Sequence, residues 1–200
     1  GTYLGIPVKV NPLFFVLLLG AALFGLLPQS LILFAVVLWH ETAHILVARL
    51  YHLDVTEVEL LPFGGVARFE ALLQTNPALE WKTAVIGPLS NVVLIGLLYA
   101  VQQYYALPPE HYEFAVLASG GLCLFNLLPA LPLDGGRVLR SILVRRRGFR
   151  EATDLAARIG QVIGVLMCCW GAYTLYLGYM GGGAFIVLGV FVFTAAASER

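Results

Sequence analysis

The stretch that decides the fold is Leu31–Leu50, LILFAVVLWHETAHILVARL, which is apolar up to Ala48 except for a short polar group near its middle. Its length is close to the roughly 20 residues that a helix needs to cross a bilayer. Ionisable side chains are costly inside a membrane, and those that occur there usually serve a function. The stretch therefore predicts a membrane-spanning helix that carries a functional group at Glu41 and its neighbours.

Four long windows of the 200-residue chain contain no Asp, Glu, Lys or Arg. They hold 31, 27, 20 and 40 residues, at positions 10–40, 83–109, 114–133 and 159–198. Only 12% of the chain is charged and 60% is hydrophobic, whereas soluble domains average about 25% charged and 45–50% apolar residues. The composition therefore predicts an integral membrane protein. Because the windows are continuously apolar, it favours spanning helices over the short alternating segments of a β-barrel.

Turn residues divide the first and last windows, so the four windows predict six transmembrane helices. Gly25 and Pro28 interrupt the first window, and the Gly178–Gly183 stretch interrupts the last one. We expect an all-α polytopic membrane protein in which residues 1–200 form a single intramembrane domain, with no soluble regulatory domain among these 200 residues. The expected helices lie near 10–27, 31–50, 83–105, 114–128, 159–177 and 184–197.

Two segments between the expected helices lack a helical pattern. Val55–Leu60 alternates apolar and polar side chains, turn residues follow at Leu61–Gly65, and Val66–Phe69 alternates again. This pattern predicts a small membrane-associated β-hairpin near 55–69, between the second and third helices. The second segment, 128–136, holds two prolines and two glycines, which exclude a regular helix after the fourth expected helix. Such irregular backbone survives at membrane depth only where protein or a wet cavity surrounds it.

The basic residues predict how the chain is oriented in the membrane. The loops at 105–113 and 178–183 hold no Lys or Arg, whereas seven arginines lie between the fourth and fifth expected helices, at positions 137, 140, 145, 146, 147, 150 and 158. Because basic loops stay in the cytosol, both termini and the Arg-rich loop are expected there. The Arg-rich loop is expected to contact anionic lipid headgroups, with an acidic partner as the alternative. The net charge is zero, which gives no indication of nucleic-acid binding.

The polar group in the second expected helix reads His40-Glu41-Thr42-Ala43-His44. Residues four apart on a helix share one face, so both imidazoles can bind a single metal ion. Glu41 lies beside the first histidine and can take a proton from an attacking water. This spacing is typical of zinc metalloproteases. The alternative is a set of polar residues that pack against other helices.

A catalytic zinc site needs a third protein ligand beside two histidines. Asp134 is the only acid between Glu113 and Glu151, and it lies in the Pro-Gly segment at the end of an apolar window. We therefore predict Asp134 as the third ligand, and the alternative is a helix N-cap in front of two glycines. The remaining candidates are loop or interfacial residues, namely His52, Asp54, Glu57, Glu59 and His111.

The His-Glu-x-x-His group at 40–44, together with Asn126 and the Pro132–Gly135 stretch, resembles the site-2 protease family of intramembrane metalloproteases. The Leu61–Val66 and Gly87–Asn91 stretches fit the same family, and the resemblance covers nearly the whole chain. The chain is most similar to the compact six-helix microbial branch. That branch includes the sporulation protease that activates a pro-sigma factor, as well as archaeal relatives.

The resemblance implies a role for each residue of the group. Glu41 is implied as the catalytic acid and base, and Asn126 as a contact of the substrate or the reacting carbonyl, with a helix–helix hydrogen bond as the alternative for Asn126. Asn91 is expected to serve in helix packing. The chain has Thr-Ala at 42–43, where Leu-Gly is commoner. Many members carry paired cystathionine-β-synthase repeats after the last helix; residues 1–200 hold none, so that domain is either absent or outside this sequence. The implied zinc ligands are His40, His44 and Asp134.

The expected function is hydrolysis of a peptide bond in or near a transmembrane segment of a membrane-bound protein, with Zn²⁺ as cofactor. The expected partners are that substrate and the lipid bilayer, and the sequence does not indicate an oligomeric state. The active site is expected toward the cytosolic side. An extended substrate can pair with the hairpin at Val55–Leu60 or Val66–Phe69, unless the hairpin only plugs the bundle. A metal-binding transporter and an inactive membrane scaffold are the alternative functions.

Overall fold

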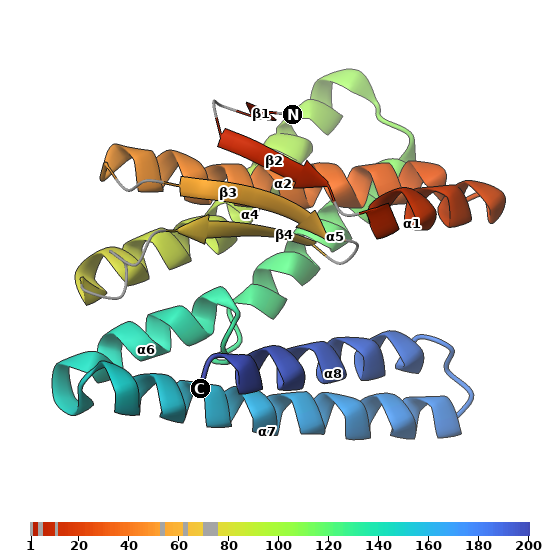
Figure 1. The fold of residues 1–200 in the computed structure, drawn as a ribbon. Helices are drawn as coiled ribbons and strands as arrows, with labels where there is room; N and C mark the ends of the chain where they lie inside the picture. The colour runs from red at the N-terminus through yellow and green to blue at the C-terminus, as the bar shows by residue number, and fades with distance from the viewer. Residues whose placement is uncertain (1, 4–5, 11, 53–54, 62–63, 70–75) are drawn as a thin grey trace. The chain divides into compact units, whose positions relative to one another are not determined.

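The computed structural model describes residues 2–3, 6–10, 12–52, 55–61, 64–69 and 76–200, and these residues are mostly helical (Figure 1). The backbone divides into two compact units, one with residues 1–79 and 86–125, the other with 80–85 and 126–200. The helices are α1 Pro12–Leu23, α2 Leu27–Leu50, α4 Pro77–Tyr105, α5 Pro109–Asn126, α6 Asp134–Arg147, α7 Phe149–Tyr176 and α8 Gly182–Ser198. The strands are β1 Thr2–Tyr3, β2 Ile6–Val10, β3 Val55–Leu61 and β4 Gly64–Phe69.

Three of the described helices are long and apolar enough to cross a membrane, namely α2, α4 and α7. The shorter α8 is also apolar. Large hydrophobic side chains on these helices are exposed, among them Leu97, Trp170 and Phe185. An outward-facing apolar surface of this extent is what contact with lipid requires. The count of six spanning helices stays a prediction.

The strands form one small sheet in the order β1-β2-β3-β4 (Figure 1). β3 and β4 are antiparallel, with Val58 opposite Ala67, and they correspond to the hairpin expected near 55–69. β2 adds to β3 in parallel, with Val8 opposite Val58. This addition was not predicted, because residues 6–10 are too short to have a strand pattern of their own. β3 is therefore paired on both sides, whereas β4 pairs only with β3 among the described residues.

In the first unit, α2 buries one face along its length. The buried apolar residues Val36, Val37, Ile45 and Ala48 recur at the spacing of a helix face. The two histidines of the polar group lie on this same face. The Trp39 indole donates a hydrogen bond of 2.9 Å to the carbonyl oxygen of Ser90 on α4. The face of α2 that packs inward is thus the face that carries the candidate ligands.

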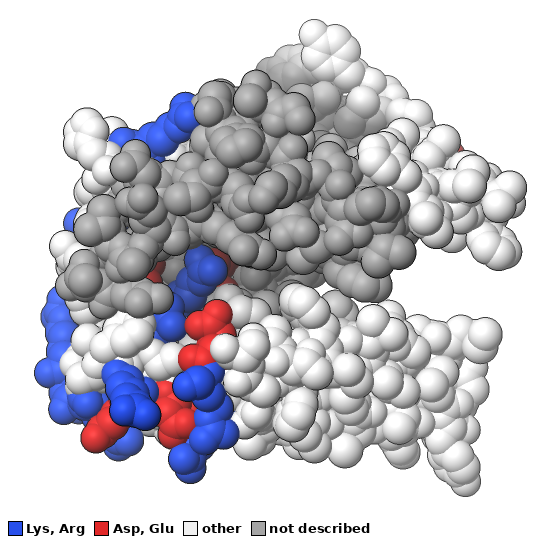
Figure 2. Space-filling model, in the orientation of Figure 1, with Lys and Arg blue, Asp and Glu red and all other residues white. Residues whose placement is uncertain are grey.

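In the second unit, α7 and α8 form a closely packed antiparallel hairpin (Figure 1). A Cβ on Gly164 would lie 2.7 Å from the Gly189 carbonyl oxygen, so the two backbones touch where both residues are glycine. Charged side chains gather at one end of this hairpin, and the rest of the visible surface over α7 and α8 is uncharged (Figure 2). The hairpin therefore has one polar end and an apolar body.

A buried ion pair links two helices of the second unit. The Arg140 guanidinium on α6 donates from Nε to Oε1 of Glu80 at 2.8 Å, and a second donor, Nη2, reaches the same oxygen. Glu80 lies in the first turn of α4 and is 2% exposed. Arg140 also lies over the Phe149 ring, with its Cζ 5.1 Å from the ring centroid. Because a buried carboxylate is costly without a partner, Arg140 is required for this packing.

The helix boundaries correct several sequence predictions. The predicted helices at 83–105, 114–128 and 159–177 begin earlier in the structure, at Pro77, Pro109 and Phe149. The Arg-rich stretch predicted as a loop instead forms α6 and the first turns of α7. Charge-free windows mark only the part of a helix that can lie in hydrocarbon, whereas a helix continues beyond the membrane boundary with charged residues. The broken segment is also shorter than predicted, because α6 begins at Asp134.

Candidate metal centre

His40 and His44 place two imidazole nitrogens at one point on the buried face of α2. Their Nε2 atoms are 3.2 Å apart, and the rings meet edge to face with centroids 4.8 Å apart. Both side chains are buried, at 3% and 5% exposure. Two nitrogens at the usual zinc bond lengths and a tetrahedral angle lie about 3.3 Å apart. The separation of the two nitrogens therefore fits zinc.

Gly87 on α4 leaves the space in which the two rings lie. A Cβ at this position would be 2.3 Å from Nε2 of His44 and 2.7 Å from Cε1 of His40. Contacts this short do not occur, so any larger residue would displace the rings or push α4 away. The close approach of α4 to the histidines thus depends on a missing side chain.

Asn91 lies one turn after Gly87 on α4 and contacts His40. Its Oδ1 is 3.2 Å from Nδ1 of His40, and its Nδ2 donates to the carbonyl oxygen of Ser119 on α5 at 3.2 Å. Asn91 is completely buried. The interaction leaves the Nε2 side of the His40 ring directed at His44, which is the side suited to a metal ion.

Asp134 is the first residue of α6 and is 6% exposed. The N-cap of the helix is Leu133, so the alternative prediction of Asp134 as an N-cap is wrong. A Cβ on Gly135 would be 2.3 Å from the Leu127 carbonyl oxygen, and a Cβ on Gly136 would be 2.3 Å from the backbone nitrogen of Leu131. The two glycines therefore let the irregular segment fold back over the first turn of α6, which holds Asp134 inside the protein.

Among the described residues, His40, His44 and Asp134 each offer a ligand atom that a metal ion could use. Two imidazoles and one carboxylate are the ligand set of many catalytic zinc sites. Glu41, the neighbour of the first histidine, is half-buried, and Asn126 is the half-buried last residue of α5. The buried His pair and the chemistry of the donor set thus agree with the predicted zinc site.

The other sequence candidates lie elsewhere. His52 is exposed, just beyond the end of α2, and His111 lies in the first turns of α5, 3.6 Å from Glu110. Asp54 lies outside the described residues, and the side chains of Glu57 and Glu59 are also outside them.

Two residues of α4 that shape the site were not predicted from the sequence. Asn91 was expected to serve in helix packing, and no individual role was expected for Gly87. The available signal was their spacing of four, which places a glycine and a polar side chain on one face of an apolar helix.

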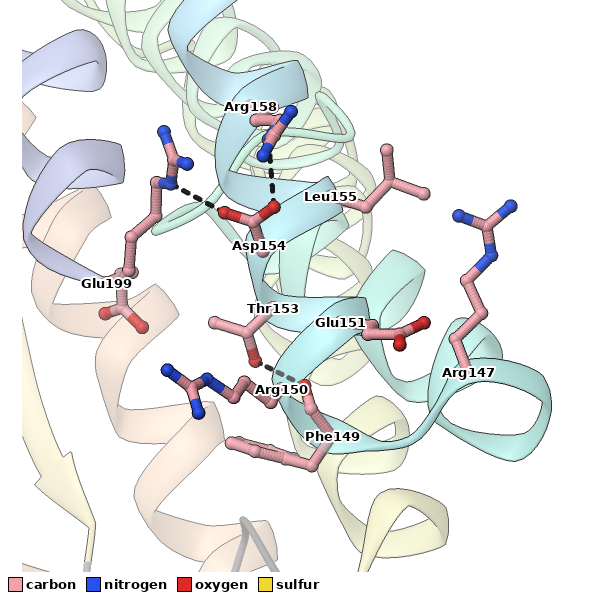
Figure 3. Close-up of a pocket in the computed structure, with 10 residues that line it drawn as sticks. Arg147, Phe149, Arg150, Glu151, Thr153, Asp154, Leu155, Arg158 and Glu199 are labelled. Carbon is pink, nitrogen blue, oxygen red and sulfur yellow. Dashed lines mark hydrogen bonds and ion pairs between the residues drawn. The ribbon is translucent and has the colours of Figure 1, made fainter.

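A separate hollow of about 710 Å³ lies in the second unit, among the first turns of α7 and the end of α8 (Figure 3). Asp154 forms an ion pair with Nε of Arg158 at 2.9 Å and accepts a hydrogen bond from Nε of Arg200 at 2.7 Å. Arg147 and Arg150 also line the hollow. It holds part of the Arg-rich stretch and none of the candidate metal ligands.

Comparison with known proteins identifies relatives along the whole chain. A solved structure, the site-2 protease from Methanocaldococcus jannaschii, superposes with a TM-score of 0.78 at 29% identity, covering 100% of this chain and 93% of that one. A zinc metalloprotease of the same organism is 29% identical over 98% of this chain and 58% of its own length. Stage IV sporulation protein FB of Bacillus subtilis is 25% identical over 94% of this chain and 65% of its own length.

The chain spans about 58% of the length of the first of these curated relatives. The apolar helices and the likeness to a membrane protease together make it an integral membrane protein. The model of Peptidase family M50 matches residues 28–109 and 108–167, which is well over half of the chain. The chain therefore belongs to Peptidase family M50.

Proposed function

We propose that this protein is an intramembrane zinc metalloprotease, which hydrolyses a peptide bond in or near a transmembrane segment of a membrane-bound substrate. The observation that carries the proposal is the buried pair of imidazole Nε2 atoms, 3.2 Å apart on an apolar helix and adjacent to Glu41. The membership of Peptidase family M50 supports the same activity.

His40, His44 and Asp134 are the proposed zinc ligands. When bound, zinc supplies Lewis-acid chemistry, which polarises the scissile carbonyl and makes water a nucleophile near neutral pH. Glu41 takes a proton from the attacking water at a carboxylate oxygen and returns it to the nitrogen of the leaving amine. The side-chain amide of Asn126 is proposed to donate a hydrogen bond to the oxygen of the reacting carbonyl.

The substrate is proposed to reach this site in an extended conformation, since a helix hides its carbonyl groups in internal hydrogen bonds. The side of β4 that has no partner among the described strands is the suitable edge for pairing with such a peptide, because β3 is already paired on both sides. Of the two candidate edges in the sequence, Val66–Phe69 is therefore favoured over Val55–Leu60.

The proposed membrane topology has six spans within one protease domain, with both termini and the active site toward the cytosol. The α7–α8 hairpin supports this orientation, because arginines at 147, 150, 158 and 200 line the hollow at its charged end. The charge-free part of α7, from 159 to 176, is about 27 Å long and ends in exposed aromatic residues. Tyr176 and Tyr179 at that end suit the opposite membrane interface.

The test of the function compares the parent chain with Glu41→Gln. Both are purified in detergent, the zinc content per chain is measured, and both are incubated with a model transmembrane substrate. We expect the parent to hold one zinc ion and cleave, and the variant to hold zinc with cleavage reduced at least about 100-fold, because a positioned base contributes on that order. A parent that holds zinc but cleaves none of a panel of membrane substrates would instead favour a metal transporter or an inactive scaffold.

A further inference from the structure

We infer that Asn91 is a positioning residue for His40: its carboxamide fixes the tautomer and the orientation of the imidazole that binds the metal. The inference deepens the proposed function and rests on it, since it concerns the same zinc ligand. It assigns a role in the metal centre to a residue of α4 that is not itself a ligand.

The two contacts of Asn91 determine which way its amide lies. Nδ2 donates to the Ser119 carbonyl oxygen at 3.2 Å, and Oδ1 faces Nδ1 of His40 at 3.2 Å. In the flipped orientation, Oδ1 would face the Ser119 carbonyl oxygen, and two acceptors would lie in contact inside the protein. A buried pair of that kind has no hydrogen bond to offset its desolvation. The carbonyl of a helical residue in α5 therefore sets the Asn91 amide.

The orientation of the amide in turn sets the proton on the imidazole. Oδ1 of Asn91 can only accept, so Nδ1 of His40 must be the atom that carries the hydrogen. A neutral imidazole with its proton on Nδ1 has its lone pair on Nε2, which is the atom directed at His44. The Ser119 carbonyl orients the Asn91 amide, and the amide orients the His40 ring. Nε2 of His40 is thus directed at the metal site before the metal binds.

Burial makes this contact different from an ordinary link between helices. His40 is 3% exposed and Asn91 is fully buried, so water cannot replace either partner. α2 and α4 are already joined one residue earlier on both helices, by the hydrogen bond from Trp39 to Ser90. That neighbouring bond joins the same two helices without touching a histidine, and it therefore supplies a matched control.

The experiment measures zinc affinity by competition with a chromogenic chelator for the parent chain, Asn91→Leu, Asn91→Asp and Trp39→Phe. Loss of the partner of a metal-binding histidine typically weakens metal binding 10–100-fold. We expect that loss in Asn91→Leu, which is similar in size but has no acceptor. Asn91→Asp keeps an acceptor oxygen toward His40 but loses the amide donor to the Ser119 carbonyl, so its affinity is expected to lie between those of Asn91→Leu and the parent. Trp39→Phe removes one hydrogen bond between the same helices and is expected to match the parent.

A second readout reports the ligand geometry directly. Cobalt(II) in place of zinc gives visible absorption bands that depend on the orientation of the imidazole ligands, and we expect these bands to shift in Asn91→Leu but not in Trp39→Phe. Should Asn91→Leu not elute as a single folded species, Asn91→Ala takes its place in both measurements.

The outcomes separate the two proposals. If Asn91→Leu has the zinc affinity and cobalt bands of the parent, the positioning role is overturned. It is also overturned if Trp39→Phe loses as much zinc affinity as Asn91→Leu, because only helix packing would then matter. A parent chain that binds no zinc overturns the proposed function itself, and the positioning role with it.

Discussion

Gly87 shows how much of the metal centre depends on a side chain that is missing. The two histidines are a local property of α2, but the room for their rings is provided by a residue more than forty positions away, on α4. A polar pair on one helix becomes a candidate metal centre only where the opposite helix comes this close. The metal centre therefore depends on Gly87 as well as on the proposed ligands.

The substitution Gly87→Ala tests this dependence. Because its Cβ would lie 2.3 Å from Nε2 of His44, we expect the variant to lose bound zinc and to be destabilised by about 1–3 kcal/mol, the usual cost of overpacking. The measurements are zinc content per chain and thermal unfolding in detergent.

Gly96→Ala is the matched control for this prediction. It lies on the same helix, and a Cβ there meets nothing within 4 Å. It is expected to keep its zinc and to be stabilised slightly, by about 1 kcal/mol, from the better helix propensity of alanine. A zinc content in Gly87→Ala equal to that of the control would contradict the steric argument.

Among the secondary-structure elements, the order of strands in the sheet shows which strand of the hairpin has an edge available for a substrate. The sequence did not distinguish the two strands. Both alternating segments of the hairpin looked equally able to pair with a substrate. The parallel addition of β2 occupies the outer side of β3. β4 keeps a free side among the described strands, and this makes it the testable edge.

Proline at two successive positions of β4 tests strand pairing with the substrate. Successive N–H groups of a strand point to opposite sides, so one of Val66→Pro and Ala67→Pro removes a group that faces β3 and the other removes a group on the free side. If the substrate pairs with β4, the proline on the free side lowers cleavage while zinc content stays at the parent level. Unchanged cleavage in both variants would exclude pairing at this edge.

The helices differ in how well the sequence predicted them, because some depend on a local pattern and others on packing. α2 was placed almost correctly because its apolar run and its expected span coincide, and it begins at Leu27 rather than at 31. α6 was missed because its arginines and its two initial glycines resemble a loop in the sequence. In the structure, the packing of Leu131 against Ala156 and Ala157 and the ion pair of Arg140 with Glu80 fix this region. These contacts join residues far apart in sequence and leave no local pattern.

For the whole molecule, the proposed zinc ion links function to stability. A ligand that binds the native state but not the unfolded chain stabilises it by RT ln(1 + [L]/Kd), which is about 2.7 kcal/mol at a free concentration of 100 Kd. We therefore expect a strong chelator to lower the unfolding temperature of the parent chain and added zinc to restore it. The measurement is a thermal scan in detergent.

His40→Ala provides the reference for this experiment. It removes one proposed ligand, so its unfolding temperature is expected to be lower at the outset and to be insensitive to chelator. An equal response of this variant and the parent to chelator would locate the bound zinc elsewhere in the protein.

The sequence alone was sufficient for the membrane character, for the helix face shared by His40 and His44 with Glu41 beside it, and for Asp134 as the candidate third ligand. These features are local: apolar windows and helical spacing are both read along the chain. Only the tertiary structure could add Gly87 and Asn91 to the site and β2 to the sheet. The contact between His40 and Asn91 joins residues 51 positions apart, and such a contact depends on how helices pack, which the pattern of either helix does not contain.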